Sequence, residues 1–251
     1  MNETIPIFKT HCSFGKSVLT DSPCGKYSEG GPMSIFKIAE REGLKTLFLA
    51  EETMIGFFNC HKIAKEMGIK LIFGVYFTVH DPRNEKHGSK VLVFSKNDAG
   101  QKELQALYSL CKTNPENTKI SEEILRKNIT DNLQLVVPFY DSFLHWNSEE
   151  FDSHFINLEG LNPVFLKEQK SHSFDNIITT AVDKYCAEHH FETLNAHTIY
   201  YDNDKDFVDL QVYKMICNKS YSGKKQTIGN PNLEHFCSDE FSWESYKRKH
   251  L

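Results

Sequence analysis

The stretch TLFLAEETMIGFFNCHKIAKEMGIKLIFGVYFTV, residues 46–79, determines the fold class of this chain. Both of its ends are continuous apolar runs, which are typical of strands buried on both faces of a sheet. Between them, apolar residues recur every three or four positions from Phe57 to Met67, and Gly68 ends this helical pattern. A buried strand, a helix and a second buried strand in this order predict a parallel sheet with helices outside it.

The same alternation continues outward along the chain. Strand-like runs cover residues 5–10, 44–50, 69–79, 90–95, 133–139, 162–168 and 191–196. Seven such runs within about 200 residues favour a closed, barrel-like α/β arrangement over an open sheet. Functional side chains of such a barrel lie at the carboxyl ends of its strands. Those ends are residues 10–13, 50–53, 75–78, 95–97, 139–142 and 196–201.

Composition and charge exclude several classes of protein. The 251 residues carry 29 basic and 34 acidic side chains, a formal net charge of −5. This balance is not that of a protein that binds nucleic acid mainly by neutralising phosphates. The chain is also too short to contain a whole replicative polymerase. The seven cysteines are scattered without a Cys-x-x-Cys pair, and no signal-peptide pattern or apolar run of membrane-spanning length occurs. We therefore expect a reduced, cytoplasmic protein whose thiols are mostly small core residues.

The ordered series of strand ends resembles a known family. The similarity runs through FKTHCSFGKSVLT (8–20), SIFKIAEREGL (34–44), the stretch quoted above, KVLVFSKNDAGQKELQALYSL (90–110) and TLNAHTIYYDNDKDFVDLQVYKMI (193–216). These segments resemble the PHP (polymerase and histidinol phosphatase) domain at the N-terminus of bacterial DNA polymerase III α subunits. FKTHCSFGKSVLT and VVPFYDSFLHWN (136–147) look most like the short standalone versions of tailed phages. The resemblance implies a distorted TIM-like (β/α)7 barrel over residues 1–218, followed by a tail over 219–251.

Active members of this family hold a metal cluster at the strand ends. The implied ligands are His-x-His, Thr-Asp-His, a Glu after Gly-x, a middle His and a final Asp-x-His. In this sequence the corresponding positions read Lys9-Thr10-His11, Leu49-Ala50-Glu51, Gly74-Val75-Tyr76, Lys90 (or Ser89 with an offset) and Thr198-Ile199-Tyr200. Most of the ligands that the resemblance implies are therefore replaced.

The replacements change the charge of the implied metal site. Lys9 and Lys90 bring ammonium groups, which cannot ligate a metal ion and repel one. His11 and Glu51 alone are too few ligands for a structural or catalytic zinc. We expect no metal and no other cofactor. A divalent ion (Zn, Mn, Fe or Mg) is expected only if the chain is an active phosphoesterase.

Polar residues still gather at the predicted strand ends. They are Lys9, His11, Ser13, Glu51, Glu52, Tyr76, Lys90, Asp141, Ser142 and Tyr200. One interpretation is a salt-bridged plug that fills a former metal site. A second is a metal-free pocket for phosphate or a nucleotide. A third is metal-independent catalysis, with His11 as acid or base and Glu51 orienting it.

The tail has a pattern of its own. Its aromatic residues Phe236, Phe241, Trp243 and Tyr246 alternate with acidic residues, and the basic run 247–250 follows. The aromatic side chains either pack on the barrel or anchor a larger protein partner. The neighbouring acidic residues oppose nucleic-acid binding through the basic run, so we expect this binding to be weak or absent. Asp202 and Asp204 lie at the start of a predicted helix over about 204–217, where aspartates stabilise the helix start.

The resemblance implies a role in DNA replication or repair. The first hypothesis is a non-catalytic accessory or scaffold protein, phage-type, that docks a replicative DNA polymerase or a proofreading exonuclease in the host cytoplasm. The alternatives are a PHP-type metal-dependent phosphoesterase or 3′–5′ nuclease with an altered site, and a phosphate- or nucleotide-binding protein. None of these is a polymerase on its own, and no membrane partner is expected.

Overall fold

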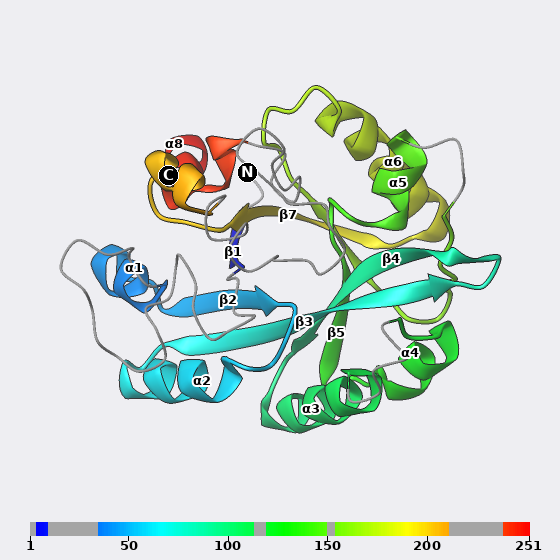
Figure 1. The fold of residues 1–251 in the computed structure, drawn as a ribbon, viewed down its shortest axis with the longest axis horizontal. Coiled ribbons are helices and arrows are strands. Elements are labelled where there is room, and N and C mark those ends of the chain that lie inside the picture. The colour runs from blue at the N-terminus through cyan, green and yellow to red at the C-terminus, as the bar shows by residue number, and fades with distance from the viewer. Residues whose placement is uncertain (1–3, 10–34, 113–118, 150–153, 211–237) are drawn as a thin grey trace, which may run out of the picture. The chain divides into compact units, whose positions relative to one another are not determined.

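The computed structural model describes residues 4–9, 35–112, 119–149, 154–210 and 238–251 (Figure 1). The strands are β1 (Ile5–Phe8), β2 (Thr46–Glu51), β3 (Lys70–Asp81), β4 (Asn84–Ser95), β5 (Leu133–Val137), β6 (Val164–Lys167) and β7 (Glu192–Ile199). The α-helices are α1 (Ile35–Glu42), α2 (Phe57–Glu66), α3 (Asp98–Lys112), α4 (Glu122–Asn128), α5 (Phe143–Glu149), α6 (Asp175–His189) and α8 (Trp243–His250). Two short 3₁₀ helices are η2 (Asp204–Asp206) and η4 (Asp239–Phe241).

These strands form a closed barrel in the order β1 to β7. β1 pairs with β2, β5 with β6 and β6 with β7 in parallel. β4, however, pairs antiparallel with both β3 and β5. The predicted TIM-like α/β barrel is confirmed, and the prediction of a wholly parallel sheet is wrong at β4.

A tight hairpin is the reason for this reversal. Only Pro82 and Arg83 separate β3 from β4, and a connection of two residues joins antiparallel strands. Residues 84–89, the first half of β4, are polar or glycine and carry no apolar strand pattern. The apolar pattern therefore predicts only the second half of β4. The reversal also places the end of β4 opposite the end of β3. Residues 95–97, at the predicted strand end of β4, therefore do not lie with the other strand ends. Lys90 does lie with them, because it pairs with Thr78 near the end of β3.

Glycines end the first two helices as the sequence predicts. Gly43 follows α1 and Gly68 follows α2, and both have a φ of 67°, which favours glycine. The predicted last helix is only partly as expected. Asn203 precedes η2 as its capping residue, and residues 207–210 continue in α-helix. The remainder of that prediction, 211–217, lies outside the described residues.

The chain divides into two compact units, each made of discontinuous segments. The first comprises Met1–Ile5, Ala50–Met54 and Ile72–Ala196. In it, α3 packs along β4 and β5, and α5 packs against α6 (Figure 1). Its core includes Phe73, Phe77, Val91, Leu107 and Phe165, each at most 1% exposed.

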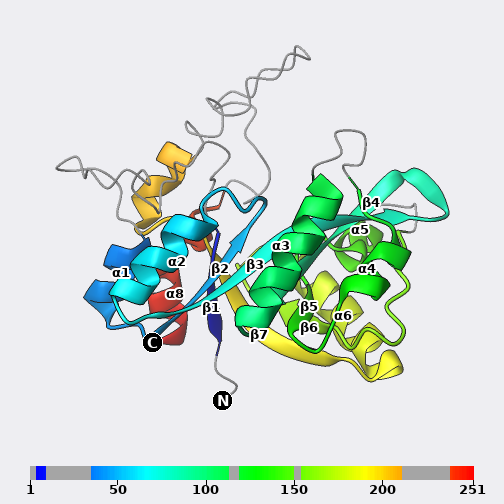
Figure 2. The same cartoon turned by 90° about the horizontal axis from the view of Figure 1, so that it is seen from below.

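The second unit comprises Pro6–Leu49, Ile55–Leu71 and His197–Leu251. Here α8 lies beside β1 (Figure 2). The indole of Trp243 stacks on the ring of Phe8, with the ring centroids 5.6 Å apart. The Tyr200 amide donates to the Phe241 carbonyl at 2.8 Å, and the Trp243 amide donates to the Tyr201 carbonyl at 2.9 Å. The last described segment is thus part of this unit's core. No helix among the described ranges is long and apolar enough to span a membrane.

Candidate functional site

The predicted site residues divide between the two units. His11 and Ser13 lie outside the described residues, as does Phe236 of the tail. The first unit holds Glu51, Glu52, Tyr76, Lys90, Asp141 and Ser142, and the second holds Lys9 and Tyr200. Each group is described within its own unit.

Lys90, Glu52 and Asp141 form an ionic cluster, called here the Lys90 cluster. Nζ of Lys90 lies 3.0 Å from Oε1 of Glu52 and 3.3 Å from Oδ2 of Asp141. The same ammonium group lies 5.8 Å from the centroid of the Tyr76 ring. Glu52 follows β2, Asp141 follows β5, and Lys90 comes from the part of β4 beside the end of β3. The structure therefore brings together four of the residues predicted from the strand ends.

Asp141 is held in place by its backbone. It adopts a left-handed conformation with a φ of 63°, which aspartate tolerates better than most residues. Its amide donates to Nδ1 of His145 at 3.0 Å, and its carbonyl accepts from the Lys90 amide at 3.0 Å. Ser142, the next residue, is fully buried, and its hydroxyl accepts from the His145 amide at the start of α5. The serine thus has a structural role in this turn rather than facing a pocket.

The Lys90 cluster is partly open to solvent and carries a net negative formal charge. The side chains of Lys90, Asp141 and Glu52 are 23%, 30% and 42% exposed. One ammonium group faces two carboxylates, so the formal charge of the three groups is −1. An incoming phosphate would meet more negative than positive charge at this position.

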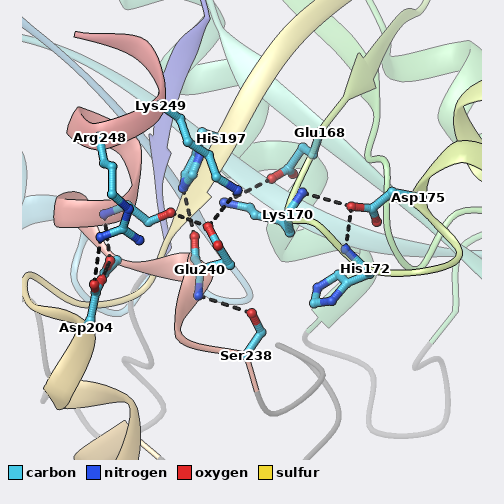
Figure 3. A network of polar contacts seen from close by, with 12 residues as sticks. Glu168, Lys170, His172, Asp175, His197, Asp204, Ser238, Glu240, Arg248 and Lys249 are labelled. Atoms are coloured by element: carbon cyan, nitrogen blue, oxygen red, sulfur yellow. Dashed lines mark hydrogen bonds and ion pairs between the residues drawn. The ribbon is translucent and has the colours of Figure 1, made fainter.

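Sequence reasoning missed a second ionic pair in the same unit. Glu168 and Lys170 follow β6 and are 3% and 1% exposed, and Nζ of Lys170 lies 3.6 Å from Oε2 of Glu168 (Figure 3). The signal was present, because charged residues directly after a buried strand mark a strand end. The predicted strand ends do not include this one.

Asp175 organises the turn that contains Lys170. Its carboxylate accepts from the amides of Lys170 and His172, at 2.9 and 3.1 Å (Figure 3). It also accepts from the Tyr140 hydroxyl at 2.9 Å. Three donors on one carboxylate, which is 4% exposed as a residue, give a well-fixed turn. This turn keeps the ammonium group of Lys170 inside the unit.

Glu51 lies at the carboxyl end of β2 and is 3% exposed. In the second unit, Lys9 is 4% exposed, and its Nζ lies 5.9 Å from the centroid of the Tyr200 ring. The Lys9 amide donates to the Ile199 carbonyl at 2.9 Å, which fixes the lysine beside the end of β7. Glu51 and Lys9 are therefore buried, unlike the partly exposed residues of the Lys90 cluster.

The metal cluster that the sequence resemblance implies does not fit the donor groups of the described residues. The implied ligand positions hold ammonium groups at Lys9 and Lys90 and phenols at Tyr76 and Tyr200. No three His, Cys, Asp or Glu residues within the described ranges lie close enough together to hold a metal ion. An ammonium group has no lone pair to offer a cation, so the set lacks ligands. His11 lies outside these ranges.

Intramolecular ion pairs occupy the basic run of the tail. Within the second unit, Lys247 pairs with Glu42 at 3.1 Å, Arg248 with Asp204 at 2.9 Å and Lys249 with Glu240 at 2.7 Å. Figure 3 shows the last two pairs beside His197. Burial by itself raises the pKa of Glu240, but hydrogen bonds from Lys249 and Ser245 lower it overall. These ion pairs neutralise the positive charges to which the phosphates of a nucleic acid would bind.

The three described aromatic residues of the tail are buried within the chain itself. Phe241, Trp243 and Tyr246 are 1%, 0% and 6% exposed. They would contact a partner only after η4 and α8 had moved away from the rest of the unit. Their docking role stays a prediction.

A surface cavity of about 310 Å³ lies elsewhere in the first unit. It is lined by Gln134, Asn162, Pro163, Val164, His190, Phe191 and Glu192. Val164 and Glu192 begin β6 and β7, so the cavity lies at the amino ends of these strands. None of the predicted site residues lines it.

Comparison with known proteins gives similarities to solved structures but none to a sequence family or a curated protein. No protein-family profile matches the sequence, and no curated protein matches it. One similar solved structure is described as a "putative metal-dependent phosphoesterase" from Bifidobacterium adolescentis, with a TM-score of 0.44 and 11% sequence identity. The alignment covers 77% of this chain and 86% of that one. A similarity of this degree does not define a function, which has to be argued from the chain's own residues.

Proposed function

We propose that this chain is a metal-free, non-catalytic barrel protein that acts as an accessory or scaffold in DNA replication or repair. The observation that carries the proposal is the Lys90 cluster, where an ammonium group lies between the carboxylates of Glu52 and Asp141. A hydrolytic metal site needs oxygen or nitrogen donors that converge on an exchangeable cation and a bound water. A covalently attached ammonium group at that place supplies neither.

The charges of the cluster also argue against the phosphate-binding alternative. Lys90 has two carboxylate partners within 3.3 Å. A nucleotide or phosphate would have to displace a carboxylate from Lys90 and tolerate the second one nearby. The described part of the site therefore supports a salt-bridged plug more than an anion pocket.

The link to DNA replication rests on the sequence resemblance to the PHP domain of polymerase III α subunits. By that resemblance, the partner is a replicative DNA polymerase or a proofreading exonuclease. The ion-paired basic run in α8 supports a protein partner over a nucleic acid, because its charges are already satisfied within the chain.

Metal analysis of the purified full chain tests the non-catalytic role. We expect substoichiometric zinc, manganese and iron, and no hydrolysis of bis-p-nitrophenyl phosphate or of single-stranded DNA from its 3′ end. Stoichiometric metal together with hydrolysis that is lost in His11→Ala would overturn the proposal in favour of the phosphoesterase alternative.

A binding experiment tests the accessory role separately. The full chain is presented to purified polymerase III α subunit and to purified proofreading exonuclease, each immobilised for interferometry. We expect saturable binding to one of them that persists at moderate salt. Binding to neither protein would reject this partner class while leaving the metal result intact.

A further inference from the structure

The surface cavity at the amino ends of β6 and β7, called here the Glu192 cavity, has a volume of about 310 Å³. A cavity of this size is large enough for a small organic molecule. Its walls come from three neighbouring strands, because Gln134 lies in β5, Val164 begins β6 and Glu192 begins β7. Val164 lies opposite Glu192 in the strand register, so the paired sheet itself holds these walls in place.

The charges around the Glu192 cavity favour a positively charged ligand. Glu192 supplies a carboxylate, and none of the described residues that line the cavity is a lysine or an arginine. The cavity also includes His190, the C-cap residue of α6. The carboxyl end of this 15-residue helix carries a partial negative charge. Both the carboxylate and the helix end would repel a phosphate.

The polar groups of the cavity offer hydrogen-bond acceptors to a ligand. Nε2 of Gln134 donates to the carbonyl of Leu135 at 3.1 Å and, more weakly, to that of Asn162 at 3.5 Å. These two carbonyls fix the orientation of the amide, so its Oε1 is the atom that can accept from a ligand. Within the described residues, no hydrogen bond or ion pair engages the side chain of Asn162 or Glu192. The cavity therefore suits a ligand with N–H donors.

An apolar wall completes the Glu192 cavity. Pro163 is buried, and Val164 and Phe191 are half-buried. The ring of Phe191 stacks on that of Phe165, with the ring centroids 5.7 Å apart, which fixes this part of the wall. A ligand with a short methylene chain removes apolar surface from water on these side chains, while its charged end stays near Glu192.

We propose that the Glu192 cavity binds a small aliphatic diamine. One ammonium group of the ligand pairs with the carboxylate of Glu192 and donates to the amide oxygen of Gln134. Its methylene chain lies against Val164 and Phe191. The inference goes beyond the proposed function, because no residue of the Lys90 cluster lines this cavity.

Isothermal titration calorimetry of the full chain with putrescine (1,4-diaminobutane), at pH 8 and low ionic strength, tests the proposal. We expect saturable binding of one molecule per chain, with a dissociation constant of about 1 mM or lower. 1,4-Butanediol has the same carbon chain without the charges, so it should bind at least about fivefold more weakly. Inorganic phosphate, the anionic probe, should give no saturable heat.

Glu192→Gln should weaken putrescine binding at least about fivefold. Glu192 is exposed at the first position of β7, so this variant should keep the melting temperature of the unmodified chain. Glu188→Gln is the matched control, because Glu188 is exposed near the end of α6 but does not line the cavity. It should leave the affinity unchanged. Gln134→Met, which removes the amide oxygen, is a second variant and should also weaken binding.

Four outcomes would overturn the inference. They are the absence of saturable putrescine binding, equal binding of 1,4-butanediol, saturable binding of phosphate, and equal affinities of the Glu192→Gln and Glu188→Gln chains for putrescine. The last of these would show only a general attraction of a diamine to a chain with a net charge of −5. None of the four outcomes bears on the metal analysis or the partner binding that test the proposed function.

Discussion

The guanidinium group of Arg41 donates two hydrogen bonds of 2.8 Å to the two carboxylate oxygens of Asp202. The Asp202 side chain is 3% exposed, whereas that of Arg41 is 38% exposed. This bidentate pair joins α1 to the turn before η2 within the second unit. The hydrogen bond to Asp202 is the main reason why the pKa of Arg41 is raised.

The first prediction concerns this pair. Arg41→Lys keeps the charge but loses the planar fork, so it should leave one oxygen of the buried Asp202 carboxylate unsatisfied. We expect a loss of about 1–3 kcal/mol in the free energy of unfolding, measured by urea denaturation. The control is Lys62→Met, which removes an exposed pair with Glu66 at 4.0 Å. It should cost less than about 0.5 kcal/mol. Equal losses of unfolding free energy in the two variants would show that the bidentate geometry of Arg41 adds no stability beyond that of an exposed ion pair.

The second prediction concerns the tail. Trp243 is fully buried and stacks on Phe8 at 5.6 Å and on Tyr246 at 4.9 Å. Trp243→Ala should lower the free energy of unfolding by about 3–5 kcal/mol, because it leaves a large cavity in the core of the second unit. Thermal or urea unfolding measures this directly.

A control substitution separates a core helix from a docking peptide. Leu251, at the end of the same tail, is 84% exposed, so Leu251→Ala should be close to neutral. If Trp243→Ala retained full stability and limited proteolysis removed the tail cleanly, the tail would be a detachable segment. The aromatic residues would then be free to serve a partner.

The barrel was largely predictable from the sequence because continuous apolar runs identify buried strands. The run 69–79 and the helical spacing after Phe57 correspond to β3 and α2. What apolar patterning did not predict was the direction of β4, because direction depends on the length of a connection. Because residues 84–89 of β4 are polar, apolar patterning does not show where β4 begins or that its connection to β3 is short.

The site was predictable where charged residues follow recognised strand ends, as Glu52 and Asp141 do. Their ion pairs with Lys90 depend on side-chain reach across three strands, which no local pattern encodes. Lys170 was missed for a different reason. A lysine after a strand is usually exposed, and its burial here results from the hydrogen bonds that Asp175 accepts in the same turn.

The third prediction uses this buried pair. Lys170→Met removes the ammonium group that lies 3.6 Å from the buried carboxylate of Glu168. We expect a loss of about 3–5 kcal/mol in the free energy of unfolding. Adding Glu168→Leu should restore most of the stability, because an apolar pair of similar volume carries no desolvation cost. A double variant as unstable as the single one would show that the two groups are not coupled.

The fourth prediction concerns acid stability. Burial by itself raises the pKa of Asp81, but hydrogen bonds from Arg83 and from the amide of Phe155 lower it to about 2. A carboxyl group whose pKa is lower in the folded chain adds stability above its unfolded pKa, and that stability is lost as the pH falls through the folded one. In the unmodified chain, the free energy of unfolding should therefore fall by about 1–2 kcal/mol between roughly pH 4 and pH 2 through this group, since half-exposed Arg83 is screened by solvent.

Asp81→Asn isolates this contribution. The variant should be less stable at pH 7, and its stability should depend less on pH between 4 and 2 than that of the unmodified chain. Asp183→Asn, which alters the exposed pair with Lys167, is the matched control and should leave the slope unchanged. Parallel acid-unfolding curves for the Asp81→Asn and unmodified chains would contradict the role assigned to Asp81.

The fifth prediction concerns thiol reactivity. Cys60, Cys111 and Cys186 are buried, as the sequence suggests for small core residues. Burial is the main cause that raises the pKa of the Cys186 thiol to about 11, and the charge of Asp183 adds to it. Because only the thiolate reacts, iodoacetamide at pH 8 should modify Cys186 at least about a hundredfold more slowly in the folded chain than in urea. Peptide mapping by mass spectrometry follows this cysteine separately from the others. Equal rates in both states would mean that α6 opens readily around it, which its packing against α5 argues against.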